Sequence, residues 1–129
     1  MSDNKSDSKS LVVNRQGDVI VASFMHSKLL DETNIHAIGV ELLALVDQNK
    51  GLKLIIDFST VSYLSSAVLG KLMAIHKGVS ATKGVLVLCG ISPNILEVFK
   101  ITKLDKLFNI DADVKTGLKT IEKKKLGLK

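Results

Sequence analysis

Two adjacent serines, Ser65 and Ser66, are the residues of this chain best placed for chemistry. They stand in LIIDFSTVSYLSSAVLGKL (residues 54–72), directly before a segment with helical apolar periodicity. Serine is a favoured helix N-cap worth about 1 kcal/mol, so one hydroxyl can simply cap that helix. A phosphorylated serine would instead add about −2 charge, which the dipole and unpaired N–H groups of a helix N-terminus favour. Such a charge would release a docked partner without unfolding the chain.

Enzyme motifs are absent from the sequence. No serine lies in a G-x-S-x-G elbow, and neither G-x-x-x-x-G-K-[ST] nor G-x-G-x-x-G occurs. His26, His36 and His76 lack paired ligand spacing, and a single cysteine cannot build a structural zinc site. We expect His76 at the core boundary and Cys89 as an inert buried thiol, because no basic residue stands near it. The sequence therefore predicts no catalytic residue, no metal and no cofactor.

The composition predicts one domain. The chain has 129 residues, is 46% hydrophobic and contains no Trp, so Leu, Ile and Val must form its core. No apolar run approaches the roughly 18 residues of a membrane span, and the polar N-terminus has no signal-peptide core. With one cysteine, this favours a cytoplasmic protein without membrane insertion. The net charge of +5 comes largely from C-terminal lysines, and the only arginine is Arg15, so we expect no nucleic-acid binding.

The first half of the chain predicts a hairpin followed by a helix. Apolar runs at residues 11–13 and 19–22 flank a turn at residues 16–18. Residues 24–30 have no clear period and are expected to form a loop. Asp31 or Thr33 can cap the next helix, which should end before Gly51. Its apolar stripe consists of Ile35, Ile38, Leu42, Leu45 and Val46.

The second half alternates strands and helices. Nearly continuous apolar runs at residues 52–58 and 85–89 predict neighbouring parallel strands buried on both faces. Ser92 should accept backbone N–H bonds as an N-cap, with Pro93 as the first helical residue. Residues 104–110 suggest a turn and an edge strand, and a last helix begins near Val114. The helix between the two buried strands carries the stripe Val68, Leu72, Ile75 and Val79, with Leu69 and Met73 beside it. This order predicts a mixed sheet with right-handed crossovers.

The stretch V-S-Y-L-S-S-A-V-L-G-K-L, preceded by I-I-D-F-S, resembles the signature of STAS domains, which include anti-sigma factor antagonists and a domain of sulfate transporters. Residues 86–93 and the spacing within residues 96–108 are similar to later parts of that family. The resemblance implies an α/β (mixed α+β) STAS fold, with a four- to five-stranded mixed sheet and about four helices mainly on one face. It places the STAS domain at residues 11–122, after a disordered arm (1–10) and before a Lys-rich tail (123–129).

The resemblance also assigns roles to single residues. Ser66 matches the serine that the family's partner kinase phosphorylates, and Ser65 is the second choice. Asp57 matches the acidic residue at the strand end. Leu69 and Gly70 match the pair that packs the helix, so we expect Gly70→Val to destabilise the fold by about 1–3 kcal/mol through overpacking.

Three positions depart from the family pattern. Ser65 stands where the family usually has Asp, and Ala67 where it often has Ser or Thr. Val68 replaces the usual Gly and is expected to change the shape of the contacting surface.

By resemblance, the chain is a non-enzymatic bacterial regulator of transcription. It would bind an anti-sigma factor that is also a GHKL-type serine kinase, with phosphorylation ending binding and a serine phosphatase resetting it. The expected docking surface comprises Leu30, Asp31, Asp57, Ser65, Ser66, Ala67 and Leu69, on a monomer or weak dimer. The alternative is an unphosphorylated STAS scaffold or sensor subunit of a signalling assembly or membrane transport complex. The changes at Ser65 and Val68 favour the alternative, whereas the retained Ser66 favours the switch.

Overall fold

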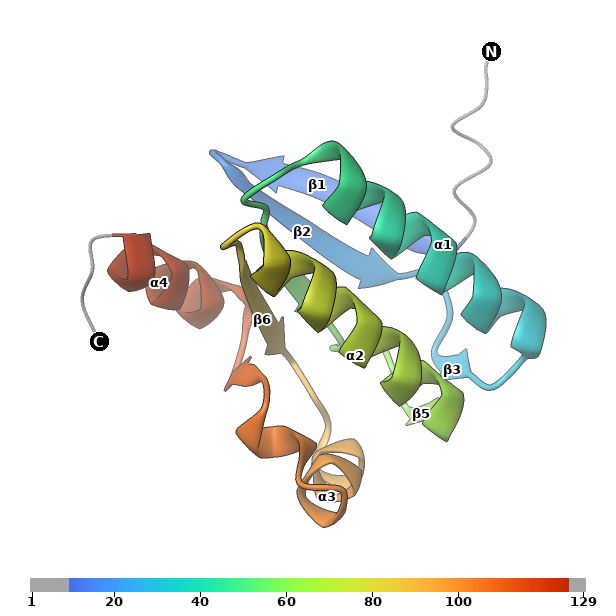
Figure 1. The fold of residues 1–129 in the computed structure, drawn as a ribbon. Coiled ribbons are helices and arrows are strands. Elements are labelled where there is room, and N and C mark those ends of the chain that lie inside the picture. The colour runs from blue at the N-terminus through green and yellow to red at the C-terminus, as the bar shows by residue number, and fades with distance from the viewer. Residues whose placement is uncertain (1–9, 126–129) are drawn as a thin grey trace.

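A five-stranded mixed sheet forms the centre of the computed structural model, which describes residues 10–125 (Figure 1). The strand order is β1-β2-β4-β6-β7; β1 and β2 are antiparallel, and the other neighbours are parallel. The strands are β1 (Leu11–Gln16), β2 (Val19–Phe24), β4 (Lys53–Asp57), β6 (Val85–Cys89) and β7 (Asn109–Asp111). The predicted mixed sheet with two neighbouring parallel central strands is therefore confirmed.

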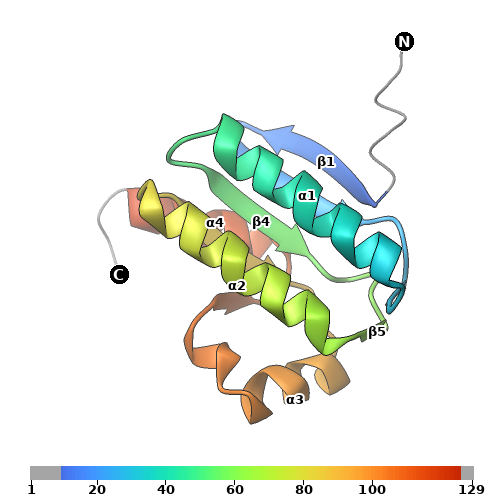
Figure 2. The same ribbon diagram turned by 45° about the vertical axis from the view of Figure 1, so that its right-hand side comes forward.

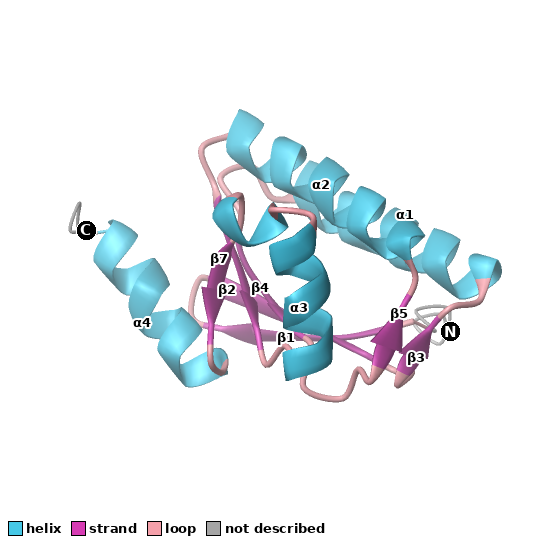
Figure 3. Ribbon diagram, turned by 90° about the horizontal axis from the view of Figure 1, so that it is seen from below, coloured by secondary structure: helices cyan, strands magenta, loops and turns pink. Residues whose placement is uncertain are grey.

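The four helices in the described part of the chain cover the two faces of the sheet unequally (Figures 2 and 3). They are α1 (Glu32–Gln48), α2 (Ser66–Ala81), α3 (Pro93–Ile101) and α4 (Val114–Lys125). The helices α1 and α2 run side by side over one face, and α3 adds Ile95 and Phe99 to the same core. The helix α4 packs on the opposite face. The prediction of about four helices packed mainly on one face is confirmed.

The central strand β4 is buried on both faces, as its continuous apolar run predicts. Leu54 and Ile56 point into the core beneath α1 and α2, whereas Ile55 joins the cluster beneath α4. None of the three side chains is exposed. Each fully buried side chain of this size contributes about 1.5–3 kcal/mol by leaving water, so both faces hold the sheet in place.

The predicted hairpin is confirmed, but the loop predicted at residues 24–30 is partly wrong. Gln16 pairs with Val19 across the turn, where Gly17 has a φ of +67° that favours glycine. Within residues 24–30, β3 (Lys28–Leu29) pairs in parallel with β5 (Tyr63–Leu64) to form a second small sheet. A run of two residues is too short to show a periodicity, so this pairing leaves no signal in the sequence.

Two of the predicted helix caps have different outcomes. Asp31 is the N-cap of α1, and its Oδ1 accepts the N–H of Thr33 at 2.8 Å. Ser92 occupies the N-cap position of α3 with Pro93 following it, as predicted. Its hydroxyl, however, donates to Oδ1 of Asn94 at 2.9 Å and makes no capping bond, so that part of the prediction is wrong.

The chain ends bear on the predicted domain limits. The turn and edge strand predicted after α3 are present as a 3₁₀ turn, η2 (Leu104–Lys106), and β7. The helix α4 begins at Val114 and continues through residues 123–125, which the prediction assigned to a tail. Ser10 is 1% exposed, and its C=O accepts the N–H of Met25 at 3.0 Å. The rest of the predicted arm and tail, residues 1–9 and 126–129, lies outside the described residues.

Gly70 does not pack the helix, contrary to the prediction. It is exposed, and a Cβ added there would meet no atom within 4 Å. Tight contacts between α1 and α2 occur instead at Gly39 and Gly78. A Cβ at Gly39 would lie 2.8 Å from Cδ of Lys71, and one at Gly78 would lie 3.0 Å from Cγ1 of Val46. Gly70 falls off the apolar stripe of α2, because successive helical residues are rotated by about 100°.

Candidate docking site at the start of α2

The small sheet of β3 and β5 joins the two loops that lead into α1 and α2. Leu29 pairs with Leu64, and the N–H of Ser65 donates to the C=O of Leu29 at 3.0 Å. The N–H of Ser62 also donates to the C=O of Ser27 at 2.7 Å. These bonds fix the two helix starts against each other, so the loop before α1 and the serines before α2 form one continuous surface.

Five residues of the predicted docking surface meet there. Leu30 is 54% exposed and follows the paired Leu29, and Asp31 caps α1 directly after it. Ser65 precedes α2, and Ser66 and Ala67 are its exposed first residues. We call Leu30, Asp31, Ser65, Ser66 and Ala67 the docking surface.

The two serines have different environments. Ser65 is in the N-cap position with extended backbone, but its hydroxyl makes no capping bond. Its oxygen is buried without a hydrogen-bond partner, and the first turn closes through its C=O, which accepts the N–H of Val68 at 3.0 Å. Ser66 is the first helical residue and is exposed. The hydroxyl of Ser66 is therefore the more accessible of the two.

A groove between the first halves of α1 and α2 extends the docking surface. It is lined by Glu32, Ile35, His36, Ala67 and Lys71. Of these, the sequence prediction included only Ala67. The sequence does show that Ala67 and Lys71 are four residues apart on one helix face, as are Glu32 and His36. This spacing identifies a groove only once it is known that α1 and α2 are neighbours.

An aromatic side chain borders the same region. Tyr63 of β5 is 54% exposed, and Nζ of Lys28 lies 5.7 Å from its ring centroid. A lysine at this distance from an aromatic ring makes a weak cation–π contact at an exposed site. With Leu30, Tyr63 provides apolar area that a protein partner could cover.

Two residues predicted for docking do not lie on this surface. Leu69 is 6% exposed and belongs to the core beneath α2. Asp57 is half-buried, and its Oδ1 accepts the N–H of Ser59 at 3.0 Å. A Cβ at Gly90, whose φ is +68°, would lie 2.7 Å from the same oxygen. Asp57 therefore shapes the turn after β4, and Leu69 holds α2 on the sheet.

Val68 is also buried, at 1% exposure. The expectation that its side chain changes the shape of the contacting surface is therefore wrong. The place of Val68 on the stripe with Leu72 explains its burial, because residues four apart on a helix share a face. Among the three departures from the family pattern, only Ala67 therefore exposes its side chain to a partner, because the hydroxyl of Ser65 is buried.

The remaining reactive groups lie away from the docking surface. His76 is half-buried, with its ring edge-on to Phe108 at a centroid distance of 5.4 Å. Cys89 is fully buried, and burial, followed by the nearby charge of Asp57, raises the pKa of its thiol to about 12. Both match their predicted environments. Within residues 10–125, no cluster of three or more His, Cys, Asp or Glu residues could hold a metal ion.

Comparison with known proteins identifies the family. Residues 10–117 match the model of the STAS domain, so the chain belongs to the STAS domain family. Within that family it is an anti-sigma factor antagonist-like protein, a class of generally non-enzymatic regulators. No helix in the described part of the chain has both the length and the apolar character needed to cross a bilayer.

Individual relatives support this assignment. BtrV of Bordetella bronchiseptica, a proposed anti-sigma factor antagonist, is 29% identical over 82 residues, covering 64% of this chain and 70% of the relative. The solved anti-sigma-factor antagonist (STAS) domain protein from Planctomyces limnophilus has a TM-score of 0.80 at 25% identity, covering 87% and 97% of the two chains. Unphosphorylated SpoIIAA, which has also been solved in its phosphorylated form from Bacillus, shares the fold. Its TM-score is 0.67 at 15% identity, over 88% of this chain and 98% of SpoIIAA.

Proposed function

We propose that this chain is an anti-sigma factor antagonist whose binding is switched by phosphorylation of Ser66. In its unphosphorylated form it binds an anti-sigma factor that is also a GHKL-type serine kinase, in the bacterial cytoplasm. Phosphorylation by that kinase ends the complex, and a serine phosphatase restores it. The observation that carries the proposal is the exposed hydroxyl of Ser66 at the start of α2, beside Leu30 and the α1/α2 groove.

The position of Ser66 allows a phosphate to be added without damage to the fold. The N–H of Val68 already bonds to the C=O of Ser65, but the first N–H groups of a helix otherwise lack partners within it, and the helix dipole favours negative charge there. α2 has no acidic residue in its first turn that would oppose a phosphate. The core beneath it, including Val68 and Leu69, would remain undisturbed.

The same phosphate would oppose a docked partner. It would stand beside the start of α1, where Asp31 and Glu32 already contribute negative charge. A partner that covers Leu30 and Tyr63 would have to bury the phosphate, and burying an unpaired charge is costly. Any carboxylate that the partner presents would also be repelled. Phosphorylation is therefore expected to change affinity more than stability.

Tagged Ser66→Ala is first used to recover the partner kinase from the native cells. The test then compares the affinities of three variants for that kinase. Ser66→Asp should weaken binding about tenfold or more, which corresponds to at least about 1.4 kcal/mol. Ser66→Ala should bind like the wild type. Ser65→Ala is the matched control, because the buried hydroxyl of Ser65 has no partner to lose. Melting temperatures show whether all three variants keep the fold.

Two results would count against the switch. One is equal affinity of Ser66→Asp and Ser66→Ala for the recovered partner. The other is mass mapping of the chain from its own cells that finds Ser66 unmodified while the protein is held in a large assembly or with a transporter. The second result would favour the scaffold or sensor alternative.

A further inference from the structure

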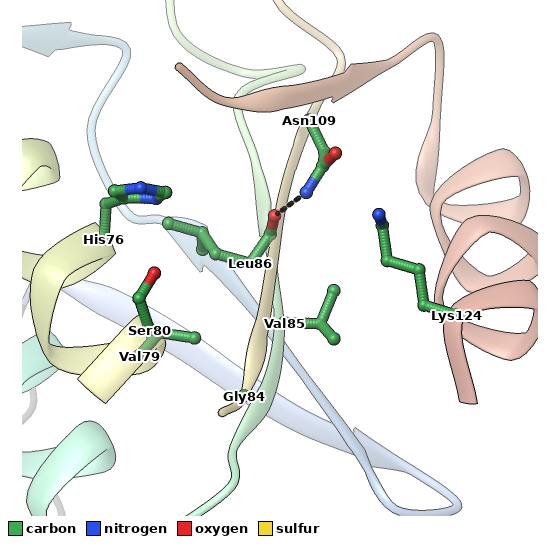
Figure 4. Close-up of a pocket in the computed structure, with 8 residues that line it drawn as sticks. All are labelled: His76, Val79, Ser80, Gly84, Val85, Leu86, Asn109 and Lys124. Carbon is green, nitrogen blue, oxygen red and sulfur yellow. Dashed lines mark hydrogen bonds between the residues drawn. The ribbon is translucent and has the colours of Figure 1, made fainter. Parts of the chain in front are cut away.

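A notch opens at the C-terminal end of α2, whereas Ser66 lies at the N-terminal end of the same helix (Figure 4). β7 pairs only with Val87, Leu88 and Cys89, so the first two residues of β6, Val85 and Leu86, extend beyond it. Nδ2 of Asn109 donates to the C=O of Leu86 at 3.0 Å and takes the place of the absent strand. The notch is thus a consequence of the unequal lengths of β6 and β7.

Polar side chains from three elements line the notch. His76 and Ser80 come from α2, Asn109 from β7 and Lys124 from α4. Figure 4 shows His76 and Ser80 on one side of Leu86, and Asn109 and Lys124 on the other. No Asp or Glu is among the lining residues, and Lys124 has no ion-pair partner within the described part of the chain. The notch therefore has a net positive charge.

Two carbonyl groups at the end of α2 that lie near the notch are already paired. The C=O of Val79 accepts the N–H of Gly84 at 2.9 Å, and that of Ser80 accepts the N–H of Lys83 at 3.0 Å. An ammonium group, a hydroxyl and an imidazole each have at least one N–H or O–H to donate. The notch consequently presents hydrogen-bond donors together with a positive charge.

We propose that this notch binds a small oxyanion of the phosphate type, held by the ammonium of Lys124 and by hydrogen bonds from Ser80 and His76. The space of about 120 Å³ is well below that of typical small-molecule sites. It can accept a phosphate group, but the rest of a nucleotide would lie outside. The notch offers no carboxylate of the kind that Mg²⁺ and Ca²⁺ prefer. The proposal does not depend on the phosphorylation of Ser66.

The test is an NMR titration of the full chain with inorganic phosphate, compared with chloride at equal ionic strength. Saturable amide shifts should concentrate at Ser80, Leu86 and Lys124. Lys124→Gln should weaken binding about tenfold, since a charge-assisted hydrogen bond is lost. Lys119→Gln is the matched control: it removes an exposed lysine from the same helix but outside the notch. It should leave the affinity unchanged.

A parallel titration with AMP distinguishes the source of the phosphate. Saturation at the same concentration as inorganic phosphate supports recognition of the anion alone. Tighter binding with the same notch shifts supports the phosphate end of a larger molecule. The proposal is overturned if chloride gives the same shifts, or if Lys119→Gln and Lys124→Gln weaken phosphate binding equally. It is also overturned if the shifts lie elsewhere, and the spectra themselves confirm that each variant is folded.

Discussion

The two faces of the sheet are built differently. Among residues 10–125, 24 buried residues form one continuous core on the face beneath α1, α2 and α3, whereas the cluster beneath α4 has six. The docking surface lies at the rim of the larger core, between α1 and α2. A regulatory site that gains or loses charge is well placed beside a large core. The free energy of unfolding of that region then depends on many buried residues and little on the few that contact the charge. The face beneath α4 depends on a single helix.

The largest expected effect comes from truncating one core side chain on each face. Leu72 of α2 and Ile121 of α4 are 0% and 1% exposed. Each change to Ala should cost about 2–5 kcal/mol of unfolding free energy, measured by urea denaturation. We expect Leu72→Ala to weaken the whole fold, because α2 belongs to the large core. Ile121→Ala should loosen α4 first, because few other residues hold that helix.

The reactivity of Cys89 shows whether a variant loosens α4 alone or weakens the whole fold. Its thiol lies in the α4 cluster, where its burial and its pKa of about 12 make it unreactive. At urea concentrations that give both variants equal unfolding free energy, alkylation of Cys89 should be faster in Ile121→Ala. Equal alkylation rates would mean that α4 and the larger core unfold as one unit, and the contrast between the faces would then have no energetic meaning.

A smaller effect separates two helical glycines. A Cβ at Gly117 of α4 would lie 3.2 Å from Cδ1 of Ile55 and 3.3 Å from Cγ1 of Val87. Gly117→Val should therefore destabilise the fold by about 1–3 kcal/mol through overpacking. Gly70→Val, with open space around it, should leave stability unchanged or raise it by a few tenths of a kcal/mol, since valine is the better helix former. Melting temperatures of the two variants test the pair, and a larger loss at Gly70 would contradict the packing described here.

These glycines show how far sequence reasoning reaches. Continuous apolar runs predicted β4 and β6, because burial on both faces requires such runs. The stripe of Val68, Leu72, Ile75 and Val79 already predicted that Val68 is buried. The resemblance to the family pattern nevertheless placed Val68 on the contacting surface and Gly70 in a packing contact. Where helical periodicity and a family motif disagreed, periodicity was correct, since it follows directly from which side of the helix meets the core.

The candidate site was only partly predictable for a different reason. Ser65, Ser66 and Ala67 are adjacent in sequence, so their common location needs no tertiary information. Leu30 and Asp31 join them through the pairing of β3 and β5. The family resemblance placed these two residues on the same surface as the serines, but neither it nor periodicity predicted the pairing. The groove residues His36 and Lys71 depend on how α1 and α2 pack, and neither source of information provided them.

The smallest effect concerns Glu41, on the α1 side of the larger core. Its carboxylate accepts backbone N–H groups of Ser10 and Leu11, yet one of its oxygens is buried without a partner. Burial raises the pKa of Glu41 above its ordinary 4.5, despite the lowering effect of the two N–H groups. The folded state therefore holds the proton of Glu41 to higher pH than the unfolded state does. As pH rises through this range, the chain loses stability because the folded state must accommodate the charge.

Glu41→Gln keeps an oxygen acceptor for Ser10 and Leu11 but removes the charge. The variant should be more stable than the wild type at pH 7, by less than about 1 kcal/mol because Glu41 is only partly buried. The difference should shrink as pH falls below 4.5, where the wild-type side chain is protonated in both states. Urea unfolding at several pH values measures this, with Glu97→Gln on the exposed side of α3 as the control. If the difference in stability between Glu41→Gln and the wild type stays constant with pH, the variant is stabilised by packing. The ionised carboxylate of Glu41 would then not destabilise the folded state.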